Sequence, residues 1–152
     1  MKELNQNIDQ SDNGITAKVA SLTNLQSIIT RMGSNSQLMK TWVVTVVTGF
    51  IAIKTAIGGL GFFSYLVPML ICFIFSYLDS YYLSQERIFR NVYNSTASIL
   101  VGGEFNYFDL KDEIEKKSAN KDNSIISCYK SNSIIFFYIP LVIMSTIVIV
   151  FG

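Results

Sequence analysis

Three apolar segments separated by polar chain constrain this sequence more than any other feature. They cover residues 41–58, 62–78 and 134–151, and they contain one charged side chain between them, Lys54. The first two are about 17 residues long, or about 26 Å of helix, which is close to the minimum that crosses a bilayer core. Because the apolar residues are gathered into these segments, we expect an all-α membrane protein with three transmembrane helices rather than a globular core.

The 152 residues divide by composition into four parts. Residues 1–14 are expected to form a flexible tail. Residues 15–101 are expected to form an amphipathic helix, a transmembrane hairpin and a cytoplasmic helix. Residues 102–132 form a cytoplasmic polar segment, and residues 133–152 form the third, C-terminal transmembrane helix.

The amphipathic helix is predicted from apolar residues at helical spacing after the tail. Steps of three and four separate Ile15, Val19, Leu22, Leu25, Ile29 and Met32, which places them on one face. The run Gly33-Ser34-Asn35-Ser36 then either ends the helix or forms an elbow before the first span.

The second span continues as a helix beyond its apolar part. We expect one helix from Phe62 to about Leu100, ended by Gly102-Gly103, whose second half leaves the membrane. Asp109 is a candidate N-cap for a short charged helix through Lys117. Residues 116–123 are expected to be a solvated loop.

The orientation follows from the basic residues near the ends of the spans. Arg31 and Lys40 precede the first span, Arg87 and Arg90 follow the second, and Lys130 precedes the third, whereas only Lys54 lies on the hairpin side. We therefore expect a bacterial inner-membrane protein whose N-terminus is cytoplasmic and whose C-terminus is periplasmic or extracellular. Trp42, Tyr77 and Tyr81 are expected to anchor the cytoplasmic interface.

A stripe of small and hydroxyl residues runs along the first span. Its members are Thr41, Thr45, Thr48, Gly49 and Thr55, and they share one helical face. Helix packing is the plainer interpretation, since small residues let helices approach closely. A pore lining is the other. The two are compatible, because a chain with three spans encloses a pore only after packing into an oligomer.

Charged and aromatic residues cluster just beyond the second span. They are Asp79, Tyr82, Glu86, Arg87, Phe89 and Arg90. Glu86 and Arg90 have the spacing of a helical ion pair. The charged members form either a solvated helix surface with incidental pairs or a bridge to the amphipathic helix or to a neighbouring subunit. We favour the bridge, in which Tyr82, Phe89 and Val92 face the amphipathic helix. The two helices then form a cytoplasmic collar, the helical region beyond the spans.

Catalytic chemistry has few candidate residues here. The chain has no histidine, which is the commonest general base and metal ligand, and Asp79 has no second carboxylate near it in the sequence. The net charge of +1 indicates no nucleic-acid surface. We expect a protein that is not an enzyme, with no catalytic residues, no cofactor and no metal.

Two motifs flank the hairpin and resemble a known family. They are RM…NS…K.W, with Arg31, Met32, Asn35, Ser36, Lys40 and Trp42, and LD.YYL..ER.FR..Y, with Asp79, Tyr81, Tyr82, Glu86, Arg87, Phe89, Arg90 and Tyr93. The arrangement resembles the small bacterial membrane proteins of the SLATT type, over about residues 15–93. The third span lies outside that pattern.

The resemblance implies an oligomeric effector of bacterial conflict or antiphage systems. Such an effector forms a pore, or otherwise impairs the membrane, after a signal that is often a nucleotide messenger. The implied partners are membrane lipid, further copies of the chain, and a separate sensor protein or the messenger itself. The alternative is a non-conducting anchor or regulatory subunit that recruits a cytoplasmic partner.

Overall fold

A computed structural model describes residues 2–57, 61–98 and 110–151, and the surroundings of side chains between 12 and 150 within these ranges. All the elements described are helices. They are α1 (Lys2–Ile57), α2 (Phe63–Ser98), α3 (Lys111–Ser118), the 3-10 helix η1 (Lys121–Asn123), α4 (Ile125–Tyr129) and α5 (Asn132–Phe151).

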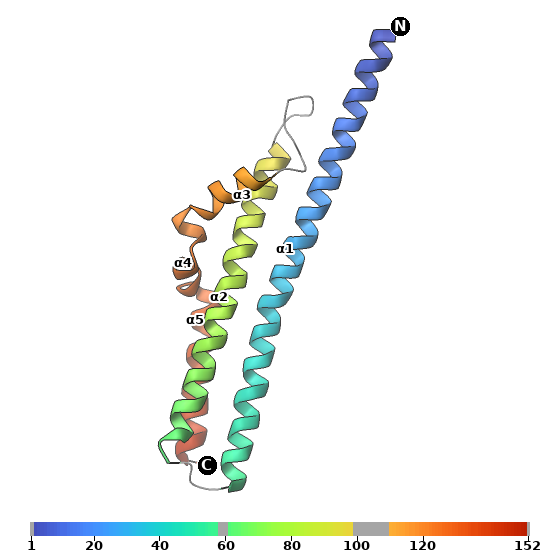
Figure 1. Cartoon of the computed structure of the whole chain (residues 1–152). Coiled ribbons are helices and arrows are strands. Elements are labelled where there is room, and N and C mark those ends of the chain that lie inside the picture. Colours follow the sequence, from blue (N-terminus) through green and yellow to red (C-terminus); the bar gives the residue numbers. More distant parts are fainter. Residues whose placement is uncertain (1, 58–60, 99–109, 152) are drawn as a thin grey trace.

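The two longest helices run antiparallel along most of their length (Figure 1). Helix α3, η1 and α4 lie along the half of α2 that is distant from the end where α1 and α2 meet. Helix α5 lies along the other half of α2 and runs toward that end. The hydrophobic core lies where α1, α2 and α5 meet, and its buried members are Val43, Val47, Cys72, Ile134 and Tyr138.

Helices α1, α2 and α5 are each long and apolar enough to cross a membrane. The chain is therefore an all-α membrane protein, as the sequence predicts. Most apolar side chains along the spans are exposed at the surface of the protein, as lipid-facing side chains are. Helix α2, with 36 residues, extends well beyond the length that a bilayer needs.

Helix α1 begins earlier and is more continuous than the sequence suggested. It is helical from Lys2, within the expected tail, and it passes through Gly33–Ser36 without the expected end or elbow. Its buried positions are Ser21, Leu25, Ile29, Ser36, Val43 and Val47, and the half-buried Met32, Lys40, Ile51 and Lys54 continue the series.

Successive positions in this series are four, four and three residues apart, and the same three steps then repeat along α1. Such an 11-residue repeat has about 3.67 residues per turn, close to that of a straight α-helix. One continuous face can therefore pack along α2 from end to end. This tertiary pairing outweighs the weak helix propensity of the Gly33–Ser36 run.

The packing face of α2 follows a spacing of four residues. Nearly every fourth residue is buried, and most of these are small: Ser64, Pro68, Cys72, Ser76, Ser80, Ser84, Ile88, Val92 and Thr96. Small side chains let neighbouring helices approach closely. Of the three residues expected to face the amphipathic helix, Val92 is buried, while Tyr82 and Phe89 are half-buried.

The region expected to be a solvated loop, residues 116–123, is largely helical. It contains the end of α3 and the whole of η1, and Asn123 is buried. The residue that precedes α3 is Leu110, which makes no side-chain capping bond. The proposed cap Asp109, the helix end at Gly102-Gly103 and the turn residues 58–60 lie outside the described residues.

Candidate functional site

A buried ion pair joins α1 to α2 at the end of the apolar spans. The Lys40 ammonium lies 2.8 Å from Asp79 Oδ2. Ser36 donates a hydrogen bond to Asp79 Oδ1, and Lys40 Nζ also donates to Ser36 Oγ at 3.3 Å. Asp79 is fully buried and the Lys40 side chain is 13% exposed, so both charges are largely removed from solvent.

The third spanning helix is joined to α2 one turn away from this buried ion pair. Tyr138 of α5 is buried, and its hydroxyl donates a hydrogen bond to the Phe75 carbonyl of α2 at 3.2 Å. The pair Lys40–Asp79 therefore joins α1 to α2, and Tyr138 joins α5 to α2 close by. The sequence predicted a role for Asp79 in the collar but did not identify Lys40 as its partner.

The other collar residues divide between the two sides of α2. Arg90 pairs with Glu86 at 2.6 Å, at the helical spacing that the sequence suggested. Glu86 also lies against Gly33 of α1. Arg87 points the other way and donates to the Asp122 carbonyl at 3.2 Å and to Ser131 Oγ at 3.4 Å. Tyr82 packs edge-on against Tyr81.

Asn123 ties the segment between α3 and α4 to the collar. Its carbonyl accepts a hydrogen bond from Ser84 Oγ, its Oδ1 accepts one from Asn91 at 3.2 Å, and its Nδ2 donates to the Lys117 carbonyl at 2.8 Å. Nothing in the surrounding polar sequence signals this burial. Nearby, burial raises the pKa of the Cys128 thiol, and the positive charge of Arg87 partly opposes that rise.

The three aromatic residues expected at the interface lie near the ion pair and are exposed. Trp42 is two residues from Lys40, while Tyr77 and Tyr81 flank Asp79. Exposed Trp and Tyr rings at the end of an apolar span are typical of a membrane–water boundary.

Lys54 marks the opposite end of the spans. Its ammonium donates to the Ile149 carbonyl in the last turns of α5 at 3.2 Å. A cation near a helix C-terminus stabilises the carbonyls there that lack helical partners. The charge inside the first span is therefore used to fasten α5 to α1.

The stripe of Thr41, Thr45, Thr48, Gly49 and Thr55 is exposed along its whole length. The hydroxyls of Thr41, Thr45 and Thr55 bond back to carbonyls four residues earlier in α1, and no atom of a neighbouring helix lies near Gly49. The stripe therefore does not pack against α2 or α5 of the same chain.

Among the described residues, no group of three or more His, Cys, Asp or Glu side chains could hold a metal ion. Comparison with protein-family models, curated proteins and solved structures found no match to this chain. Its function is therefore inferred from its own residues and geometry.

Proposed function

We propose that the protein is an oligomeric effector that forms a pore, or otherwise disrupts the inner membrane, in bacterial antiphage defence. The observation that supports this most directly is the exposed stripe of Thr41, Thr45, Thr48, Gly49 and Thr55 on a helix long enough to span. Small residues on an unoccupied helical face favour close packing with a helix of another copy. The resemblance to SLATT-type proteins supplies the defence context.

The trigger acts on the collar in this proposal, through a separate sensor protein or a nucleotide messenger. Helices α1 and α2 both continue beyond their apolar spans, so a displacement of the collar is carried into the membrane by rigid helices. The Lys40–Asp79 pair holds α1 against α2 at the boundary between collar and span. Separating the pair would leave two buried charges without partners. In the proposal, this energetic cost keeps the resting arrangement closed.

Dye release from liposomes tests this function. The protein is reconstituted with and without the collar trigger, and the Thr45→Leu/Thr48→Leu variant is compared with Val46→Leu/Ile53→Leu. Val46 and Ile53 are exposed on the same span outside the stripe, so they form a matched control. We expect the threonine variant to stop leakage and the control to retain it. A native protein that never conducts under any trigger would refute the proposal.

A non-conducting anchor is the second candidate, and one cavity favours it. A space of about 660 Å³ lies between α1, α2 and α3, beyond the spans. Its lining mixes apolar residues such as Leu25 and Phe89 with polar ones such as Asn24 and Lys111, which suits a cytoplasmic partner. Expression of the chain together with its trigger separates the candidates, because an effector then depolarises the cells and an anchor leaves the membrane tight.

A further inference from the structure

A lateral pocket of about 270 Å³ lies between α2 and α5. Its floor is buried and includes Cys72, Ser76 and Tyr138, whereas its rim includes the exposed Met69 and Phe73. The pocket therefore opens outward from the two helices. Since both helices can span a membrane, the opening faces the acyl chains of the bilayer.

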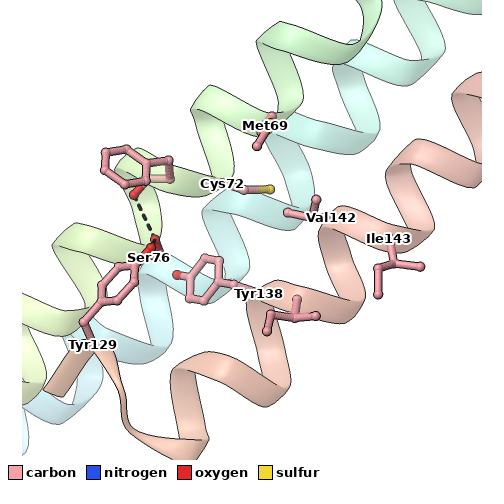
Figure 2. A pocket seen from close by; sticks show the side chains of 9 residues that line it. Met69, Cys72, Ser76, Tyr129, Tyr138, Val142 and Ile143 are labelled. Carbon is pink, nitrogen blue, oxygen red and sulfur yellow. Dashed lines mark hydrogen bonds between the residues drawn. The ribbon is translucent and has the colours of Figure 1, made fainter. Parts of the chain in front are cut away.

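The two ends of this pocket differ in chemistry (Figure 2). At one end, the Tyr129 and Ser76 hydroxyls lie 3.2 Å apart and hydrogen-bond. Toward the other end, Met69, Val142 and Ile143 present only apolar atoms. Ser76 and Met69 are seven residues apart on α2, which is about 10 Å along the helix.

A cation follows the residue that forms the polar end. Lys130 comes directly after Tyr129, at the end of α4, and its side chain is exposed. An apolar wall and a hydroxyl pair are therefore followed, one residue along the chain, by an exposed lysine. That order matches one amphiphile, an anionic phospholipid whose acyl chain enters from the bilayer and whose headgroup stays at the interface.

We propose that the groove between α2 and α5 binds the acyl chain of an anionic phospholipid, with its headgroup beside Lys130. A helix of a second copy fits less well, because it would place apolar side chains along the groove and offer nothing to the lysine. Binding of this lipid needs α2 and α5 in the membrane but needs no pore. It can therefore hold or fail independently of the effector function.

Fluorescence quenching by brominated lipids tests this site in the full-length protein. Trp42 is the only tryptophan and lies on α1, outside the groove, so the native chain reports on bulk lipid. The Trp42→Phe/Phe73→Trp variant places the reporter at the groove rim. Both proteins are reconstituted in phosphatidylcholine vesicles that contain a small fraction of brominated phosphatidylglycerol or brominated phosphatidylcholine.

We expect the groove reporter to prefer brominated phosphatidylglycerol by about fivefold, the preference that one lysine near the surface confers. Trp42 should show a smaller preference. Lys130→Gln should remove the preference of the groove reporter. Val142→Phe, which fills the groove, should lower its quenching to the level at Trp42, whereas Ile147→Phe, on the exposed face of α5, should leave it unchanged.

Two results would overturn this site. Quenching of the groove reporter that equals that of Trp42 for both lipids would show bulk contact only. Quenching below that of Trp42 would show that protein, such as a second copy, covers the groove. Native mass spectrometry supplies a readout independent of the reporter: the unsubstituted chain should retain phosphatidylglycerol, and Val142→Phe should retain less.

Discussion

Asp79 is the residue whose environment departs most from that of an ordinary surface carboxylate. It is fully buried, and its two oxygens face Ser36 and Lys40 of α1. The pair Glu86–Arg90 has similar charges at a similar distance, but its arginine is 61% exposed. A comparison of the two pairs therefore separates the effect of burial on stability from the effect of charge.

We expect Asp79→Ala to lower the free energy of unfolding by about 3–5 kcal/mol, because it leaves the Lys40 ammonium buried without its partner. The double variant Lys40→Met/Asp79→Leu should recover most of that loss, since no charge then remains. Arg90→Ala removes the 61% exposed partner of the Glu86–Arg90 pair; as the control, it should cost about 0.3–0.5 kcal/mol. Denaturation in detergent, followed by circular dichroism, measures all three.

The interpretation of the buried pair fails if Asp79→Ala costs no more than Arg90→Ala. It also fails if the double variant is as unstable as the single one, because the loss would then come from the missing packing of Asp79. A cycle that includes Lys40→Met alone measures the coupling between the two residues directly.

At the scale of elements, hydropathy was sufficient to predict the three spans and the long second helix. Spans are recognised locally, because a membrane selects for continuous apolar length. The continuity of α1 could not be predicted in this way, since the Gly33–Ser36 run is a poor helix former by itself. The 11-residue repeat that supports it becomes evident only when buried positions such as Ser36 and Lys40 are counted with the apolar ones.

Gly33→Ala distinguishes a continuous α1 from an elbow. A methyl group at Gly33 would lie 3.5 Å from Glu86 Oε2, an ordinary contact. We expect the free energy of unfolding to rise by about 0.5–1 kcal/mol, the usual gain when alanine replaces glycine inside a helix. Gly49→Ala, with nothing within 4 Å, is the matched control. Destabilisation by Gly33→Ala alone would indicate a bend at this position.

The burial of Asn123 is a second feature that could not be predicted from the sequence, since it depends on partners far away in the chain. We expect Asn123→Ala to cost about 1–3 kcal/mol, because Asn91 and the Lys117 carbonyl lose a partner at a buried site. Hydrogen exchange should quicken over residues 111–131 and stay unchanged over 43–54. Asn94→Ala, at an exposed position, should change neither. Faster exchange over the whole protein would show that Asn123 supports more than this segment.

At the scale of the whole molecule, the two ends of the spans are chemically different. One end has the aromatic residues, the Lys40–Asp79 pair and the collar, and the other has the hairpin and the Lys54 contact to α5. Most of the basic residues near the spans lie at the collar end. The positive-inside rule therefore predicts a cytoplasmic collar, on the side where the proposed trigger would have to act.

Cysteine labelling in whole cells measures this orientation. Native Cys72 and Cys128 are buried, so they give a low background to an impermeant maleimide. Phe62→Cys introduces an exposed thiol at the hairpin end, and Asn94→Cys introduces one on the collar. We expect Phe62→Cys to react in intact cells and Asn94→Cys to react only after the membrane is permeabilised. The reverse pattern would place the collar outside, where a cytoplasmic sensor could not reach it, and the proposed route from trigger to membrane would be lost.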